Sequence, residues 1–341
     1  MTKSSFYKNI ALILFGTVVL LLIVNILVSK YVDKDEQPKH REVLSGIEID
    51  KIFHTALANY GFSTNWIIKK KIKSISGDSL YSTYNVNVPN DVSIHSLLLE
   101  LKNLFWEDDV EIDAEELANP KRTLVRLISD QKLKLAAELT NSDKIKREFG
   151  TIAFLVNDLP LKNEEVLKSF LITPELFYAV LTPRDEAKKR LSQIAKANKR
   201  YALLLDDNIT ELNFKLSSSY SDDKIKKSIR EIVGTFYNAA FFIIDDRSDL
   251  FESEKYPLIK SELLKRGIVL VPKSRFEFLT SSKVNTGDKF QDFMLTVKKS
   301  DEKILMVNAQ DFLIISSLIP AYRKIGYKFI YPGDIIIKRN F

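Results

Sequence analysis

The chain has 341 residues, of which 45% are hydrophobic and 28% are charged, so it is long enough for two domains with sizeable cores. Its 51 basic and 45 acidic residues are interleaved and give a net charge of +6, and no basic face with interleaved aromatic residues indicates a nucleic-acid partner. The chain contains no cysteine, which excludes disulfide bonds, thiolate nucleophiles and cysteine-ligated zinc.

Residues 10–29 read IALILFGTVVLLLIVNILVS and contain no charged side chain. A stretch of this length can cross a hydrocarbon core of about 30 Å. Lys3 and Lys8 precede it, whereas the residues after it carry both signs of charge, which favours a cytoplasmic tail at 1–9. We therefore predict a single-pass membrane protein whose bulk is extracytoplasmic, either periplasmic or at the cell surface. A cleaved signal peptide is the alternative, but no small-residue cleavage site follows.

A charged linker at 30–45 leads into a predicted small α+β domain at 46–140. Apolar residues at helical spacing predict helices near 49–60 and 94–105. Strand-like runs lie near 66–73, 79–88, 109–113, 122–128 and 132–138.

The pattern becomes regular in the predicted second domain, at 151–341, where short apolar runs alternate with helical patterns. This alternation predicts a parallel α/β sheet, open or closed into a barrel. Thr182 is the expected N-cap of one helix, and Pro320 is expected to break or kink the last one. The predicted strands are 152–156, 177–181, 201–205, 240–244, 268–271, 304–307 and 328–331.

Chemistry in such folds collects at the C-terminal ends of the strands. Three predicted strands end in aspartates, among which Asp158, Asp207 and Asp246 are the candidate catalytic carboxylates. Aspartate and asparagine also favour turns and helix starts, which is the competing interpretation. The strand-end residues that we expect to bind a polar ligand are Asn157, Asp158, Asp206, Asp207, Asp245, Ser274, Arg275 and Asn308.

Five stretches carry a family resemblance: IAFLVNDLPL, ELFYAVLTPRDEAKKRLSQIAKANKRYALLL, IVGTFYNAAFF, GIVLVPKSRF and SSLIPAYRKIGYKFIYP. The order of their strands and helices and their small motifs resemble the divergent polysaccharide deacetylase family, over residues 151 to about 337. The resemblance implies an α/β fold with a seven-stranded (β/α) deacetylase-like barrel. Before that barrel we expect the small α+β domain and one N-terminal transmembrane helix.

The family's mechanism implies a divalent metal held by one aspartate and two histidines, with a second aspartate as base for the metal-bound water. Carried over, the two aspartates fall on Asn157 and Asp158, and the histidines fall near Leu205, on Asn238 or around Asn308. Asn238 thereby joins the expected binding residues. The only histidines are His40, His54 and His95, all before residue 151. We therefore predict no metal site and no cofactor.

Three hypotheses for the function remain open. The first is a pseudoenzyme that binds a cell-envelope glycan or acts as a scaffold in carbohydrate or cell-wall metabolism, with Phe236, Tyr237 and Phe276 as possible sugar-stacking residues. The second is an acid-only or Mg²⁺/Ca²⁺-dependent hydrolase that acts on an envelope polysaccharide. The third is a component of an envelope protein complex, with the 46–140 domain as its contact surface.

Overall fold

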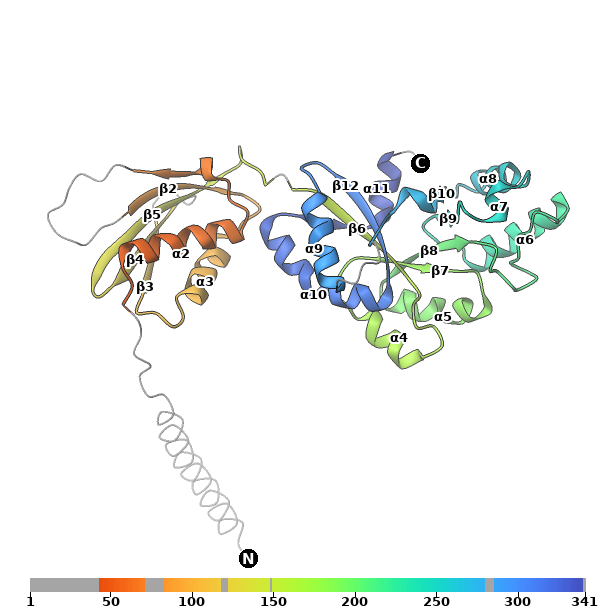
Figure 1. Cartoon of the computed structure of the whole chain (residues 1–341), viewed down its shortest axis with the longest axis horizontal. Coiled ribbons are helices and arrows are strands. Elements are labelled where there is room, and N and C mark those ends of the chain that lie inside the picture. The colour runs from red at the N-terminus through yellow and green to blue at the C-terminus, as the bar shows by residue number, and fades with distance from the viewer. Residues whose placement is uncertain (1–42, 71–81, 118–121, 148, 280–284, 340–341) are drawn as a thin grey trace, which may run out of the picture. The chain divides into compact units, whose positions relative to one another are not determined.

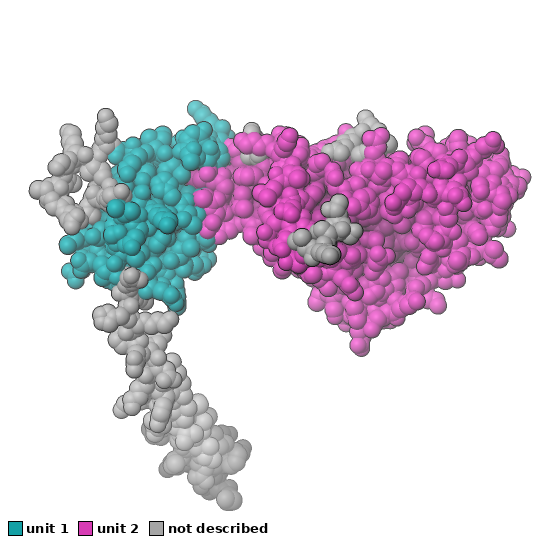
Figure 2. All heavy atoms as spheres, in the orientation of Figure 1, with its two compact units in different colours: residues 1–57, 63–145 teal, residues 58–62, 146–341 magenta. Residues whose placement is uncertain are grey.

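The computed structural model describes residues 43–70, 82–117, 122–147, 149–279 and 285–339 (Figure 1). The predicted membrane segment at 10–29 and most of the predicted linker lie outside these residues. Within the described part of the chain, no helix has the length and apolar character needed to cross a membrane. The chain divides into a small unit, up to Leu57 and from Ser63 to Ile145, and a large unit made of 58–62 and 146–341 (Figure 2).

The small unit has a five-stranded sheet in the order β1-β2-β5-β4-β3. Helices α2 (Gly46–Asn59) and α3 (Ile94–Leu104) cover one face of it (Figure 1). Buried and partly exposed residues alternate along β2 and β4, as expected for a sheet with one covered face. The strands are β1 (Ile67–Lys69), β2 (Ser82–Pro89), β3 (Glu111–Glu116), β4 (Arg122–Ser129) and β5 (Lys132–Ser142).

The large unit contains an eight-stranded parallel sheet in the order β10-β9-β8-β7-β6-β12-β11, with β13 paired to the first half of β6. All seven strands predicted for this unit are present, which confirms the α/β class, and the two-residue β11 is an addition. The strands are β6 (Thr151–Asn157), β7 (Tyr178–Leu181), β8 (Arg200–Leu205), β9 (Phe242–Ile244), β10 (Leu270–Pro272), β11 (Glu277–Phe278), β12 (Glu302–Asn308) and β13 (Lys328–Ile330).

The sheet is curled into a half-barrel, and chain connectivity explains why. β10 and β11 lie at opposite ends of the strand order, yet only residues 273–276 join them. Six strand spacings of about 4.8 Å separate the ends of a flat sheet by about 29 Å, whereas the few connecting residues reach at most about 17 Å. The sheet must therefore curl to bring its two ends together.

The sequence allowed an open or a closed barrel, and the barrel is open among the described residues, because no strand pairing joins β10 to β11. A parallel pair needs a crossover connection of a dozen or more residues, and this connection is far shorter. It forms instead a single 3-10 turn, Lys273–Arg275.

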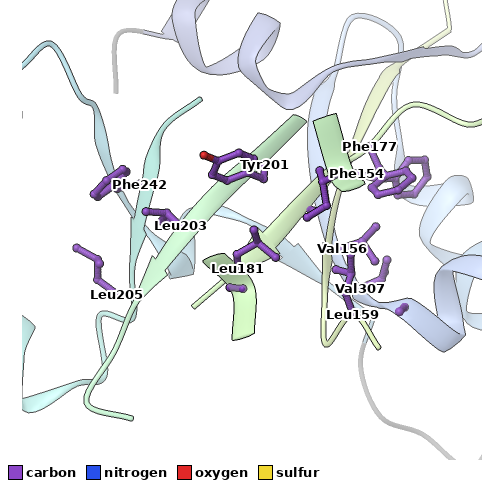
Figure 3. Packing of buried hydrophobic residues seen from close by; sticks show 14 of the residues in the cluster. Phe154, Val156, Leu159, Phe177, Leu181, Tyr201, Leu203, Leu205, Phe242 and Val307 are labelled. Carbon is purple, nitrogen blue, oxygen red and sulfur yellow. The ribbon is translucent and has the colours of Figure 1, made fainter. Parts of the chain in front are cut away.

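Both faces of the sheet are buried, which explains why its strands are continuous apolar runs. Along β6, Ile152, Phe154 and Val156 pack against the surrounding helices, and Ala153 and Leu155 face the interior of the half-barrel. Figure 3 shows part of the helix-side cluster. The helices are α4 (Glu164–Leu171), α5 (Asp185–Lys196), α6 (Asp222–Thr235), α7 (Asp249–Glu252), α8 (Tyr256–Leu264), α9 (Thr286–Thr296), α10 (Ala309–Ile325) and α11 (Pro332–Arg339).

The predicted start of one helix was wrong, and the expected break of another helix at Pro320 is absent. Helix α5 begins at Asp185 and not directly after Thr182, because Arg184 is still extended, with φ −146° and ψ 156°. Helix α10 continues as one element through Pro320. Proline removes a single backbone donor there, while the buried Phe312 and Ile319 before it and the partly buried Tyr322 after it anchor the helix in the core.

Candidate functional site

The parallel strands bring most of the predicted site residues to one edge of the large unit. Asn157 ends β6, Asp206 follows β8, Asp245 follows β9 and Asn308 ends β12. Asn238 does not join them, because it precedes β9 and therefore lies at the opposite edge of the sheet. The alignment that placed a family histidine on Asn238 is thus wrong in register.

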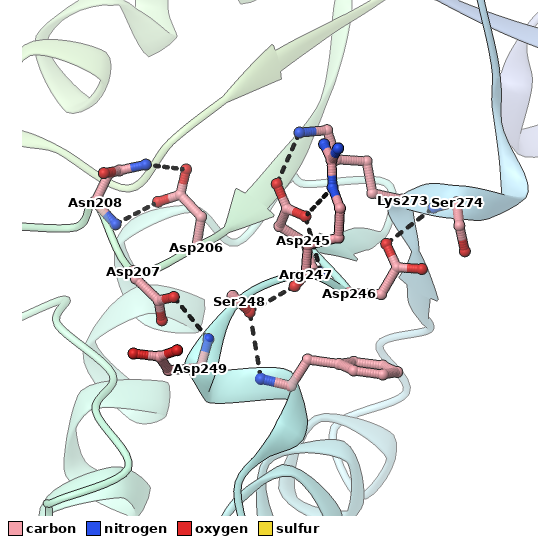
Figure 4. Close-up of polar contacts among 11 residues, drawn as sticks. Asp206, Asp207, Asn208, Asp245, Asp246, Arg247, Ser248, Asp249, Lys273 and Ser274 are labelled. Carbon is pink, nitrogen blue, oxygen red and sulfur yellow. Dashed lines mark hydrogen bonds and ion pairs between the residues drawn. The ribbon is translucent and has the colours of Figure 1, made fainter.

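Four aspartates after β8 and β9 form what we call the aspartate cluster: Asp206, Asp207, Asp245 and Asp246 (Figure 4). Helix α7 has its own N-cap, Ser248, whose Oγ accepts the amide of Phe251 at 3.2 Å. Asp207 adds a second cap, because its two carboxylate oxygens accept hydrogen bonds from the amides of Asp249 and Leu250, at 2.8 and 3.3 Å. Both carboxylate oxygens of Asp207 therefore bond to backbone amides at the start of α7.

Asp245 forms an ion pair across two strand ends. Its Oδ2 lies 2.8 Å from Lys273 Nζ, and its Oδ1 accepts the backbone N–H of Arg247 at 3.1 Å. The side chains of Asp245 and Lys273 are 19% and 21% exposed. Burial opposes ionisation of Asp245, but the hydrogen bonds from Lys273 and Arg247 outweigh it and hold the pKa of this carboxyl below its usual value.

The other two members of the aspartate cluster shape their loops. Asp206 accepts the backbone N–H of Asn208 at 3.0 Å, an Asx turn, and Asp246 accepts that of Ser274 at 3.1 Å. Ser274 and Arg275 are exposed in the turn after β10. The competing interpretation of the sequence, that these aspartates serve turns and helix starts, describes the whole cluster.

Asn308 also has a capping role. Its Oδ1 accepts the backbone N–H of Asp311 at 2.8 Å, and its Nδ2 donates to the Asp311 carboxylate at 2.8 Å. Thr286 donates to the other oxygen of Asp311, which ties α9 to the start of α10. Asn308 is therefore a structural residue at the strand-end edge.

Asn157 and Asp158 differ from the aspartate cluster. Asp158 adopts a left-handed backbone conformation, with φ 54°, and its carboxylate accepts a 2.8 Å hydrogen bond from Asn157 Nδ2. It lines a cavity of about 300 Å³ at the ends of β6 and β7, which we call the Asp158 pocket. Its other lining residues are Leu159, Pro160, Leu161, Lys162, Val180, Leu181, Thr182, Arg184, Glu186 and Ala187.

The Asp158 pocket contains residues that the sequence did not single out. Arg184 Nη2 donates to the carbonyl of Asn208 at 3.1 Å, while its buried Nε has no hydrogen-bond partner among the described residues. Lys162 and Glu186 add one charge of each sign. No sequence pattern marks them, because isolated charged residues beside a helix start are ordinary surface features.

The residues at this edge do not fit the metal that the family resemblance implies. Residues 96–341 contain no histidine, and the described residues contain no group of three side chains suited to hold a metal ion. Asp158 and Asp246 follow β6 and β9, which are separated in the sheet by β7 and β8, and Asp207 is bonded to the start of α7. The geometry therefore gives no support to the acid-only or Mg²⁺/Ca²⁺-dependent hydrolase.

The aromatic residues suggested for sugar stacking separate in the structure. Phe236 and Phe276 are buried in the core. Tyr237 is 76% exposed, but with Asn238 it lines a different cavity, of about 660 Å³, at the opposite edge of the sheet. None of the three lines the Asp158 pocket.

Comparisons with known proteins find no matching family model and no matching curated protein. Among solved structures, a CE4 family pseudoenzyme from Bacillus anthracis is 14% identical, with 65% of this chain and 88% of that chain covered and a TM-score of 0.37. The catalytic domain of a peptidoglycan N-acetylglucosamine deacetylase from Eubacterium rectale is 11% identical over 56% of this chain and 91% of that chain, with a TM-score of 0.37. A family 4 carbohydrate esterase from Bacillus subtilis is 11% identical over 57% and 83%, with a TM-score of 0.36.

Proposed function

We propose that the large unit is a non-catalytic, deacetylase-like domain that binds a carbohydrate of the cell envelope in the Asp158 pocket. In the same proposal, residues 10–29 anchor the chain in a membrane and the described units are extracytoplasmic. The observation that carries the binding site is the position of Asp158: it is the strand-end carboxylate that lines a cavity, whereas the aspartate cluster is occupied by backbone amides and a lysine.

The lining of the Asp158 pocket suits a sugar. A carboxylate accepts hydrogen bonds from hydroxyl groups, and arginine and lysine donate them. Leu159 and Leu161 supply an apolar wall for the C–H face of a sugar ring. The volume of about 300 Å³ is at the lower end of the range for small-molecule sites.

The test uses the full chain and soluble chitooligosaccharides, with binding followed by isothermal titration calorimetry. We expect Asp158→Asn and Arg184→Ala each to weaken binding about tenfold, because each removes a charged hydrogen-bonding group from the site. Arg275→Ala is the matched control, since Arg275 is exposed at the same edge but outside the pocket.

The same samples test catalysis. We expect no release of acetate and no zinc binding of structural-site affinity, because zinc prefers nitrogen or sulfur ligands. Acetate release with one-to-one zinc binding, both lost in Asp158→Ala, would show that the domain is an enzyme. If the wild type, Asp158→Asn and Arg184→Ala bind the sugar with equal affinity, the Asp158 pocket is not the binding site.

A further inference from the structure

The edge strand of the small unit is strongly acidic. Residues 107–116 hold seven carboxylates and no basic residue, in a chain whose net charge is +6: Glu107, Asp108, Asp109, Glu111, Asp113, Glu115 and Glu116. β3 lies at the end of the strand order and, among the described residues, pairs with β4 alone. An edge strand presents backbone donors and acceptors that can pair with another extended segment.

A groove lined by both apolar and polar side chains runs between β3 and α3. Two hollows of about 490 and 360 Å³ share the lining residues His95, Leu98 and Ala114, and so form one continuous groove along the helix. Eleven helical residues give α3 a length of about 16 Å, which matches about five residues of an extended chain. The groove therefore has the length of a short β-strand.

The groove carries exposed apolar side chains. Leu99 is 59% exposed and Trp106 is 68% exposed, and both line it. In its wall, Asn141 Oδ1 is buried without a hydrogen-bond partner in the described part of the chain. Exposed large apolar residues beside an open strand edge are typical of peptide-binding surfaces.

The negative charge of β3 determines which kind of segment can bind in the groove. Arg126 of β4 forms ion pairs with Asp113 and Glu115, at 2.6 and 3.0 Å, but the structure gives Glu111 and Glu116 no basic partner among the described residues. A second copy of this chain would set one acidic edge against another, and like charges on adjacent strands are destabilising. A basic segment is attracted to the same edge.

We infer that the small unit binds a basic, extended segment of a partner protein, which adds to the edge of β3 and inserts an apolar side chain between α3 and β3. The backbone hydrogen bonds supply affinity that does not depend on sequence. The carboxylates of β3 and the exposed apolar side chains of the groove, Leu99 and Trp106, select a segment in which lysine or arginine alternates with apolar residues.

The test titrates the full chain against a fluorescein-labelled, seven-residue peptide of alternating lysine and valine, and follows fluorescence anisotropy. We expect saturable binding that weakens as salt rises. Reversing two charges, in Glu111→Lys with Glu116→Lys, should weaken binding at least about tenfold. Leu99→Asp should weaken it by a similar factor, because a charge then faces the buried side chain of the peptide.

Matched controls separate this surface from general charge effects. Glu231→Lys with Glu254→Lys makes the same change of net charge on exposed residues of the large unit and should leave the affinity unchanged. A peptide with glutamate in place of lysine should not bind. The proposal is overturned if the lysine peptide does not saturate at millimolar concentration, if the glutamate peptide binds equally well, or if the groove variants bind like the wild type. Dimers in sedimentation that disappear in Leu99→Asp would also overturn it, because they would assign the groove to a second copy.

Discussion

The aspartates after β8 and β9 differ from the aspartate after β6 in whether a helix start or a lysine uses them as a hydrogen-bond acceptor. Helix α7 is capped by its own Ser248, which accepts the amide of Phe251, but its first two amides donate to Asp207 on another strand end; Lys273 takes Asp245 as its partner. Helix α4, which follows β6, is capped by its own Asn163, which accepts the amides of Glu165 and Val166. Asp158 is therefore not needed as a cap and lines a cavity instead. Aspartates at the same end of the sheet therefore differ in role. Those that face a helix start or a lysine stabilise the fold, whereas Asp158 faces neither and stays available to a ligand.

The largest effect that separates the two regions is expected from Lys273→Met. It leaves the Asp245 carboxylate, 19% exposed, without its ammonium partner. We expect a loss of about 2 kcal/mol in the free energy of unfolding, below the cost for a fully buried pair. Urea unfolding of the large unit can be followed by far-UV circular dichroism. Trp66 and Trp106, the only tryptophans, both belong to the small unit, so their fluorescence serves as an internal control. Lys260→Met, at an exposed position, should change neither signal.

Asp207→Ala is expected to cost about 1 kcal/mol of unfolding free energy, the usual cost of removing a helix cap. The amides of Asp249 and Leu250 lose their acceptor, so amide hydrogen exchange at the start of α7 should also become faster. Asp292→Ala, at an exposed position of α9, is the matched control. Unchanged exchange in α7 would show that the cap contributes nothing.

A smaller effect concerns pH. The pKa of Asp245 is lower in the folded protein than its ordinary value, so the folded state binds this proton more weakly than the unfolded state. The resulting stability is fully present above the unfolded pKa of about 3.9 and is lost as the pH falls through the lower folded pKa. Below about pH 4, the wild type should therefore lose unfolding free energy more steeply than Asp245→Asn. Parallel curves for the two proteins would contradict the ion pair.

The smallest effect on stability is expected from Asp158→Asn, within about 0.5 kcal/mol of the wild type. Asparagine tolerates the left-handed conformation at this position, and the carboxylate caps no helix. A loss as large as that of Asp207→Ala would place Asp158 among the structural aspartates and end the comparison. If Asp158→Asn weakens sugar binding and leaves the free energy of unfolding unchanged, the difference between Asp158 and the aspartate cluster is clearest.

The strands of the large unit could be predicted from the sequence because each is buried on both faces, so that runs such as Ile152–Val156 are uniformly apolar. β11 escaped prediction because two exposed residues, Glu277 and Phe278, form no pattern. The choice between an open and a closed sheet could not be made from the sequence, since it depends on how few residues join β10 to β11.

The site was less predictable than the fold. The sequence located most strand-end polar residues, but it could not tell a cap such as Asp207 from a pocket residue such as Asp158, because the distinction depends on where α7 starts in space. Asn238 was misplaced because a short motif was matched without the strand boundaries around it. Arg184 was missed because the loop before α5 carries no signal of its role.

The position of β6 has a consequence for how the protein is made. Thr151, at its start, pairs with Glu302 on β12 and with Lys328 on β13, the last strands to be synthesised. Until those strands leave the ribosome, β7 is the only neighbour available to β6, and only for its second half. Such distant pairings slow folding and leave apolar strand edges open to aggregation in the meantime. The large unit can therefore complete its sheet only after almost the entire chain has been translated, and a nascent chain stalled before residue 300 would expose β6, whose residues 152–156 are fully buried in the folded domain.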